Sequence, residues 1–194
     1  MRISELLLNE SEILDEITRP THRAAAKILA DAGYKLLGSG LYANVYAKPD
    51  DNYVLKLFSN DDEAYINFMY LTIGNPNPHF PKFKGKMMRV TDDYYAIRME
   101  RLTPLKINTD DSRKLARNLS TYTKLIQQKA GRRQPDNEKI IAINEYMDEL
   151  DEEQPGIKYA CNIIGNNLKT ETVDIHDENI MMRGNVLVIT DPVI

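Results

Sequence analysis

The chain has 194 residues, of which 42% are hydrophobic and 28% charged, and its formal net charge is -4. This composition is typical of a soluble globular protein with one domain or two small lobes, and the acidic balance argues against direct binding to nucleic acid. No run of about 18 apolar residues predicts a membrane span, and acidic residues interrupt any signal peptide. The single cysteine, Cys161, excludes an internal disulfide framework and suits a reducing cytoplasm, where we expect it to be a buried structural thiol.

The first third of the chain predicts two helices, over residues 3–16 and 21–32, followed by three strands between residues 34 and 58. The turn between the first two strands contains Gly38-Ser39-Gly40, and Val45 follows in the spacing G-x-G-x-x-G-x-V, with an alanine in place of the third glycine. Glycines allow the backbone to approach a phosphate closely and to direct N–H groups at it. A Gly-Ser-Gly turn by itself is weak support for phosphate binding, because hairpins and linkers use it too.

Lys56 stands within the third strand, Tyr53–Phe58, among apolar residues. A charge there is costly without a partner, unless the lysine faces solvent on an edge strand. The next segment predicts a helix from Asn60 or Asp61 to about Ile73, and Glu63 in its first turns is the candidate for an ion pair with Lys56. Because Glu63 follows Lys56 by only seven positions, pairing with Asp62, or no pair at all, stays open.

The middle of the chain predicts a turn and a strand over residues 77–85, in which His79 is a turn residue and not a ligand. A further strand, residues 94–102, ends in Met-Glu-x-Leu. Helices are predicted over residues 110–129, 138–150 and 155–168, with a loop at 130–137. The last helix has an apolar inner stripe of Ile157, Ala160, Cys161 and Ile164.

The final segment carries three oxygen-bearing side chains in a compact pattern. Asp174 and Asn179 lie five positions apart, and a predicted hairpin then leads to Asp191. Two carboxylates and an amide are hard oxygen ligands that suit Mg²⁺, with one carboxylate left to orient a hydroxyl. The alternative is an ordinary surface hairpin whose turns favour Asp and Asn.

The order of these features resembles the protein-kinase fold, from residue 34 to the C-terminus. The resemblance implies an α+β, two-lobed fold with an antiparallel-sheet N-lobe and a mostly helical, shortened C-lobe. It divides the chain into an N-terminal helical extension, 1–33, an N-lobe with its hinge, 34–102, and a helical C-lobe, 103–194, that carries the catalytic and metal loops.

The resemblance also implies Mg²⁺ and ATP as cofactors and gives each motif a role. Asp174 would orient the attacking hydroxyl and accept its proton, while Asn179 and Asp191 would bind Mg²⁺. Lys56, paired with Glu63, would hold the ATP phosphates. The adenosine side of the site would consist of the glycine-rich turn and the hinge, namely Gly38, Ser39, Gly40, Val45, Met99, Glu100 and Leu102. Met99 would back the adenine, and the backbone of Glu100 and Leu102 would bond its edge.

Residues 30–40 and 174–193 further resemble the early serine/threonine protein kinase of short-tailed coliphages. That resemblance implies a bacteriophage enzyme that phosphorylates host bacterial proteins in the host cytoplasm. Its targets would belong to the transcription or RNA-processing machinery, and their phosphorylation would help to shut off host transcription.

The sequence departs from the kinase pattern at several positions. Thr172-Val173 replace the His-Arg of H-R-D, and Asp191-Pro-Val replaces D-F-G, so we expect no switch by activation-loop phosphorylation. His176 replaces a lysine and is similar to the Asp-x-His-x-x-Asn loop of antibiotic and other small-molecule kinases. There it would either pack in the loop, or shape it and approach the γ-phosphate.

The sequence ends three residues after Asp191, without an activation segment or A-P-E motif. The chain is then either a truncated form of a longer kinase or a minimal one whose substrate site is built by residues 1–33 or 108–150. Three functions stay open: a serine/threonine protein kinase, a small-molecule kinase of the antibiotic-phosphotransferase type, and a non-catalytic kinase-fold protein that inhibits a host enzyme by binding.

Overall fold

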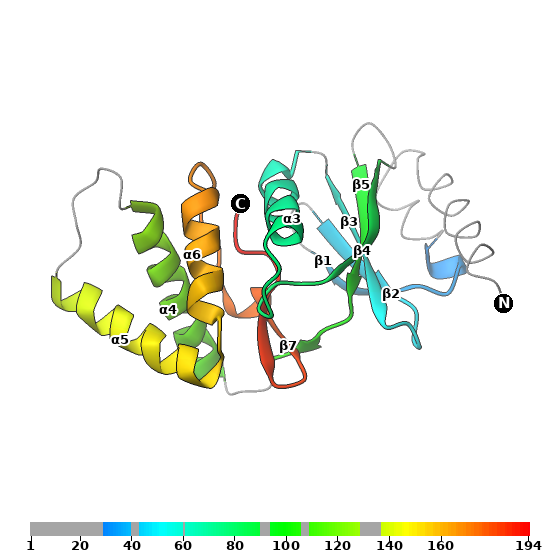
Figure 1. Ribbon diagram of the computed structural model, residues 1–194. Coiled ribbons are helices and arrows are strands. Elements are labelled where there is room, and N and C mark those ends of the chain that lie inside the picture. Colours follow the sequence, from blue (N-terminus) through cyan, green and yellow to red (C-terminus); the bar gives the residue numbers. More distant parts are fainter. Residues whose placement is uncertain (1–28, 40–42, 60, 90–93, 106–108, 129–136) are drawn as a thin grey trace. The chain divides into compact units, whose positions relative to one another are not determined.

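The computed structural model describes residues 29–39, 43–59, 61–89, 94–105, 109–128 and 137–194. They form two compact units, Met1–Asp62 with Lys82–Arg101, and Glu63–Pro81 with Leu102–Ile194 (Figure 1). The first unit is an antiparallel sheet and the second is mostly helical, which confirms the predicted α+β class. The division differs from the predicted lobes, because residues 63–81 group with the helical unit instead of the sheet.

The sheet of the first unit has five strands in the order β1-β2-β3-β5-β4, all antiparallel to their neighbours. The strands are β1 Lys35–Ser39, β2 Ala43–Ala47, β3 Tyr53–Ser59, β4 Phe83–Arg89 and β5 Tyr94–Glu100. Central strand β3 pairs with β5 along its whole length, and its residues 54–58 are all buried. Burial on both faces explains why this strand is apolar almost throughout.

Both faces of this sheet carry apolar clusters. Tyr46, Leu55, Leu57 and Ala96 face one side, where Leu29 and Tyr34 pack on them. The helix that contains Leu29 ends at Gly33, as predicted, because Gly33 adopts the left-handed conformation (φ 85°) and Tyr34 N–H bonds the Leu29 carbonyl at 2.8 Å. The predicted helix 3–16 and most of the helix 21–32 lie outside the described residues.

The opposite face of the sheet is built by Ala47, Val54 and Met99, with Val45 and Phe83 packed against them. Lys56 lies on this face, because it stands two positions after Val54 and opposite Val45 in the register. This face of the sheet therefore combines an apolar cluster with the buried Lys56.

The second unit combines four helices with a small sheet. The helices are α3 Glu63–Gly74, α4 Thr109–Gln128, α5 Asn137–Glu153 and α6 Ile157–Asn167, and the strands are β6 Thr103–Pro104, β7 Ile180–Arg183 and β8 Val186–Ile189.

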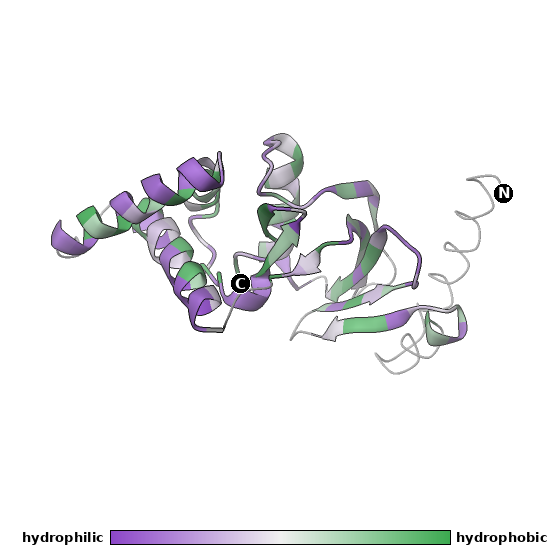
Figure 2. Ribbon diagram, turned by 90° about the horizontal axis from the view of Figure 1, so that it is seen from below, coloured by the Kyte–Doolittle hydropathy of each residue, from purple (hydrophilic) through white to green (hydrophobic). Residues whose placement is uncertain are grey.

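Hydrophobic and hydrophilic residues alternate along α5 (Figure 2), and the predicted α6 stripe is fully buried. Helix α6 begins two residues later than predicted, after Gly156 (φ 97°). The predicted loop 130–137 lies almost wholly outside the described residues. No described helix is long and apolar enough to span a membrane.

Helices α4 and α6 cross at very short range, and Gly165 makes this possible. A Cβ atom at Gly165 would lie 2.7 Å from Ile126 Cβ and 2.8 Å from the Thr123 carbonyl oxygen. Backbone and branched Cβ atoms cannot move aside cheaply, so only glycine fits this crossing.

Replacing Gly165 by alanine should therefore destabilise the second unit, by about 1–3 kcal/mol for overpacking. The matched control is Gly74→Ala, because a Cβ atom at this position, the end of α3, meets nothing within 4 Å. We expect this substitution to change the free energy of unfolding by less than about 0.5 kcal/mol. Thermal and urea unfolding of the two variants measure the difference. Equal stability of the two variants would show that α4 and α6 can move apart without cost.

Candidate active site

The β7–β8 hairpin brings Asn179 and Asp191 together at its open end. The two strands pair from Arg183–Val186 to Ile180–Ile189, around a tight turn in which Gly184 has φ 61°. Beyond the last pair, the backbone N–H and the hydroxyl of Thr190 both donate to the Asn179 carbonyl, at 2.9 and 3.1 Å. Asn179 therefore stands immediately beside the residue that precedes Asp191.

Asp174 is held at the same place by a second set of backbone bonds. Its N–H donates to the Pro192 carbonyl at 2.7 Å, and Thr172 and Ile194 exchange a pair of bonds of 2.9 Å. The side-chain amide of Asn179 donates to the Asp174 carbonyl at 2.9 Å. The structure thus gathers Asp174, Asn179 and Asp191, as the sequence predicts, although their chemical roles stay a prediction.

This oxygen-bearing group fits Mg²⁺ held together with a nucleotide. The Nδ2 atom of Asn179 is used in the bond to Asp174, which leaves its Oδ1 atom as the ligand atom, and Asp191 adds a carboxylate. Across the described ranges, no three or more His, Cys, Asp or Glu side chains are grouped to hold a metal ion. Mg²⁺ is commonly bound by one or two protein oxygens plus substrate phosphates, and the donors here match that mode.

His176 lies beside the predicted catalytic carboxylate, with its Nε2 atom 3.7 Å from Asp174 Oδ2. Both side chains are partly open to solvent, with 44% and 42% of their areas exposed. With 44% of its side-chain area exposed, His176 is not packed away in the loop, and its approach to the γ-phosphate stays a prediction.

The loop that leads to Asp174 is anchored to both neighbouring helices. Asn67 of α3 donates to the Glu171 carboxylate at 2.9 Å, and Gln127 of α4 donates to the Leu168 carbonyl at 2.6 Å. Partial burial raises the pKa of Glu171, but hydrogen bonds from Asn67 and Thr170 outweigh it, and the pKa is lowered. Helices α3 and α4 therefore fix where the loop begins.

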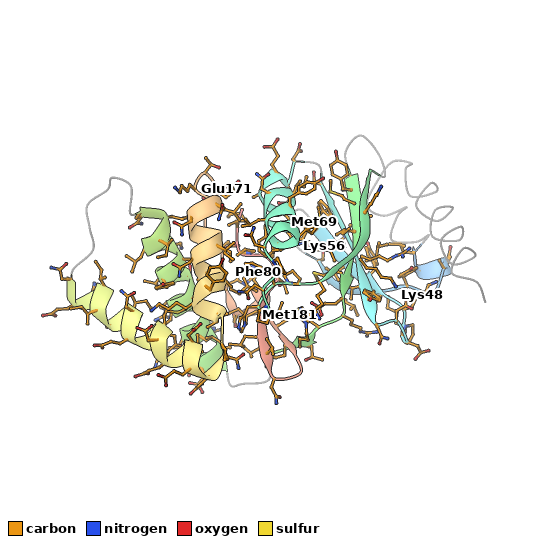
Figure 3. The ribbon with its side chains drawn as sticks, viewed as in Figure 1. Lys48, Lys56, Met69, Phe80, Glu171 and Met181 are labelled. Atoms are coloured by element: carbon orange, nitrogen blue, oxygen red, sulfur yellow. The ribbon has the colours of Figure 1, made fainter. Side chains whose placement is uncertain are left out.

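In the first unit, Lys56 is almost fully buried, with 5% of its surface exposed (Figure 3). Strand β3 lies between β2 and β5, where Lys56 stands opposite Val45 and Ile97. A solvent-facing lysine on an edge strand is thereby ruled out. Glu63 is the first residue of α3 and belongs to the second unit, so its ion pair with Lys56 stays a prediction.

The predicted glycine-rich turn leaves β1 through Gly38 and Ser39, and Gly40 lies outside the described residues. The Ser39 hydroxyl donates to the Asn44 side-chain oxygen at 2.6 Å, and the amide of Asn44 lies 3.4 Å from the Tyr46 hydroxyl. These bonds join the end of β1 to the start of β2, and the buried Asn44 connects the two strands there.

At the hinge-like strand end, the structure limits which backbone atom of Glu100 could bind a nucleotide. Met99 is buried in the apolar cluster, as expected for a residue behind an adenine, but the N–H of Glu100 donates to the Lys82 carbonyl at 2.9 Å. A nucleotide contact at Glu100 would therefore have to use the carbonyl oxygen and not the N–H. Leu102 is buried in the second unit.

Cys161 takes no part in this chemistry. Burial raises the pKa of its thiol to about 12, so the nucleophilic thiolate is absent near neutral pH. The predicted structural role for this cysteine agrees with its complete burial.

Comparisons with known proteins give structural likenesses only. No family model matches the sequence, and no curated protein matches it. The PK-1 kinase of Cydia pomonella granulovirus is similar over 87% of this chain and 57% of its own, with 13% identity and a TM-score of 0.35. The ternary complex of APH(2″)-IIa with streptomycin and ATP is similar over 89% and 72%, with 14% identity and a TM-score of 0.34. This chain thus spans little more than half of the granulovirus kinase, and such likenesses assign it no activity.

The two roles of the Asn179 amide can be separated by substitution. Asn179→Asp keeps an oxygen ligand but loses the N–H donor to Asp174, whereas Asn179→Ala loses both. We expect the affinity for ADP in the presence of Mg²⁺ to fall by about tenfold in the first variant and by more in the second. Calorimetric titration of ADP into each variant, with and without Mg²⁺, measures these affinities. An unchanged Mg²⁺-dependent affinity in Asn179→Ala would remove Asn179 from the metal site.

Proposed function

We propose that the chain is a Mg-ATP-dependent phosphotransferase. The observation that carries this proposal is the gathering of Asp174, Asn179 and Asp191 by backbone bonds at the end of one hairpin. The first unit adds a buried lysine on a sheet face with an apolar cluster, which are the groups needed for a phosphate and a base.

In this proposal each residue has one task. Asn179 Oδ1 and the Asp191 carboxylate hold Mg²⁺, and Lys56 neutralises phosphate charge. Asp174 orients the acceptor hydroxyl and takes its proton as the phosphorus–oxygen bond forms. Bound Mg-ATP supplies the γ-phosphoryl group. Phosphoryl transfer depends mainly on positioning and charge neutralisation, and these are the tasks that the proposal gives to the four side chains.

The finer proposal is a serine/threonine protein kinase of a bacteriophage that acts on host proteins in the bacterial cytoplasm. It is supported by the resemblance of residues 30–40 and 174–193 to the coliphage early kinases. Its substrates would be proteins of host transcription or RNA processing.

A small-molecule kinase is the second candidate, and one observation favours it. His176 lies 3.7 Å from Asp174 in the Asp-x-His-x-x-Asn pattern that resembles antibiotic kinases. The two candidates share the phosphoryl chemistry and differ in the acceptor.

The first test is incubation of the purified protein with labelled Mg-ATP and bacterial lysate. Asp174→Asn should reduce the label at least about 100-fold, because it removes the proton acceptor but keeps the shape. The matched control is Glu178→Gln, the same chemical change at an exposed acid four positions away, which should label like the wild type.

Each outcome separates the candidates. Labelled proteins that disappear in Asp174→Asn identify a protein kinase, and label confined to small molecules identifies the second candidate. Equal labelling by the wild type and Asp174→Asn would refute catalysis by Asp174. If the wild type transfers no label but still inhibits a host enzyme, the third function, inhibition by binding, is correct.

Lys56→Met tests the nucleotide side. Methionine keeps the apolar stem but removes the charge, so the affinity for Mg-ATP should fall by about tenfold or more. The control is Lys86→Met, at an exposed position on β4. Equal affinity of the two variants for Mg-ATP would show that Lys56 is only a structural lysine.

A further inference from the structure

The last residues of the chain, red in Figure 1, pair as a short antiparallel ladder with the segment that leads to the catalytic loop. Thr172 and Ile194 exchange two hydrogen bonds of 2.9 Å, in which each N–H donates to the other's carbonyl. Val173 and Val193 form the next pair, an antiparallel bridge. Hydrogen-bonded and non-hydrogen-bonded pairs alternate along an antiparallel ladder, so the pair that follows should again exchange two bonds.

That following pair consists of Asp174 and Pro192, and it makes one of the two bonds. The Asp174 N–H donates to the Pro192 carbonyl at 2.7 Å. The reciprocal bond would run from the N–H of residue 192 to the Asp174 carbonyl, but the backbone nitrogen of a proline carries no hydrogen. The regular ladder therefore stops here, and the Asp174 carbonyl receives no donor from residue 192.

The side chain of Asn179 uses the Asp174 carbonyl instead. Its Nδ2 atom donates to this carbonyl at 2.9 Å, which leaves Oδ1 as the atom that can bind a metal ion. The carbonyl of Asn179 is bound at the same time by the N–H of Thr190, also at 2.9 Å. The backbone and the side chain of Asn179 are thus both held, and the side chain is held by one bond.

A backbone N–H at position 192 would compete for that bond. It would point along the ladder at the Asp174 carbonyl, where the Asn179 amide now donates. Pro192 is buried, so the competing group would be held close to the carbonyl and away from water. The identity of residue 192 therefore bears on how the Asn179 amide is oriented.

We propose that Pro192 is a positioning residue for Asn179. Because it lacks an N–H, it ends the ladder at Asp174 and leaves the Asp174 carbonyl to the Asn179 amide. The inference rests on the proposed function, in which Asn179 Oδ1 binds Mg²⁺. Its consequence is that a residue that is not itself a ligand sets part of the Mg²⁺-dependent affinity for a nucleotide.

Pro192→Ala tests this, because it restores the missing N–H. ADP binding is measured by calorimetry with and without Mg²⁺, and the ratio of the two affinities isolates the metal contribution. We expect this ratio to fall by about fivefold, the effect of losing one hydrogen bond that orients Asn179. The matched control is Pro104→Ala, the same change at an exposed proline of β6, which should keep the wild-type ratio.

Pro192→Val is a second variant that restores the same N–H with a side chain that strands favour, so it should lower the ratio as Pro192→Ala does. An unchanged ratio in a folded variant at position 192 would overturn the proposal, because the N–H would then have no effect on the metal site.

The background Asn179→Asp identifies the route of the effect. An aspartate keeps an oxygen ligand but cannot donate to the Asp174 carbonyl, so the bond that Pro192 protects is already absent. Adding Pro192→Ala to this variant should change the ratio by less than about twofold. A fall as large as in the wild-type background would overturn the proposal, because Pro192 would then act through another residue.

A second readout requires no nucleotide. In NMR spectra, the side-chain amide signals of Asn179 should shift in Pro192→Ala, and the new N–H of residue 192 should be protected from exchange with water. If the wild type binds no ADP, the proposed function fails, and these signals then decide the role of Pro192. Unchanged Asn179 amide signals, or a residue-192 N–H that exchanges freely, would overturn it.

Discussion

The geometry of the candidate site depends on a few backbone hydrogen bonds made just beyond the ends of a four-residue strand pair. Thr190 bonds the Asn179 carbonyl, and Asp174 bonds the Pro192 carbonyl. Because backbone groups make these contacts, the three side chains do not have to find one another through flexible rotamers. Their starting points are fixed by the sheet register, and a slip of one residue would turn Asp191 to the opposite face. The chemistry that we propose requires such fixed backbone positions, since phosphoryl transfer depends mainly on how the reacting groups are positioned.

The groups that each unit contributes to the proposed function lie in different environments. The carboxylates of the second unit are partly exposed, so their charge costs little and a cation can reach them. Lys56 has the opposite environment, because it is buried on the sheet face that carries the apolar cluster of Ala47, Val54 and Met99. An ammonium group in such surroundings gains strongly from anionic contacts that water would weaken, which suits a group that receives phosphates. The carboxylates are thus accessible to a cation, whereas Lys56 lies in surroundings of low dielectric constant.

Much of this arrangement was predictable from local pattern. Apolar runs and turn residues predicted the strands of the first sheet, the α6 stripe and the hairpin that gathers Asp174, Asn179 and Asp191. Strand β6 was not predicted, because Thr103-Pro104 is too short to show any periodicity. The contacts of the buried His79 were not predictable either, since the two carbonyl oxygens beside its ring lie 76 and 108 positions away and backbone acceptors leave no trace in the sequence. The grouping of α3 with the helical unit likewise depends on contacts such as Asn67 with Glu171, not on the helix itself.

The bridge between Val173 and Val193 has a consequence for how the chain acquires its structure. It closes a ring of about twenty residues, whereas the strand pair β3–β5 joins residues as far apart as Tyr53 and Glu100. The entropy lost on closing a loop grows with its length, so the ring that carries the candidate catalytic groups is the cheaper of the two to form. Contacts that are close in sequence also form faster. We therefore expect the ring from Val173 to Val193 to close more readily than the long-range pairing of β3 with β5.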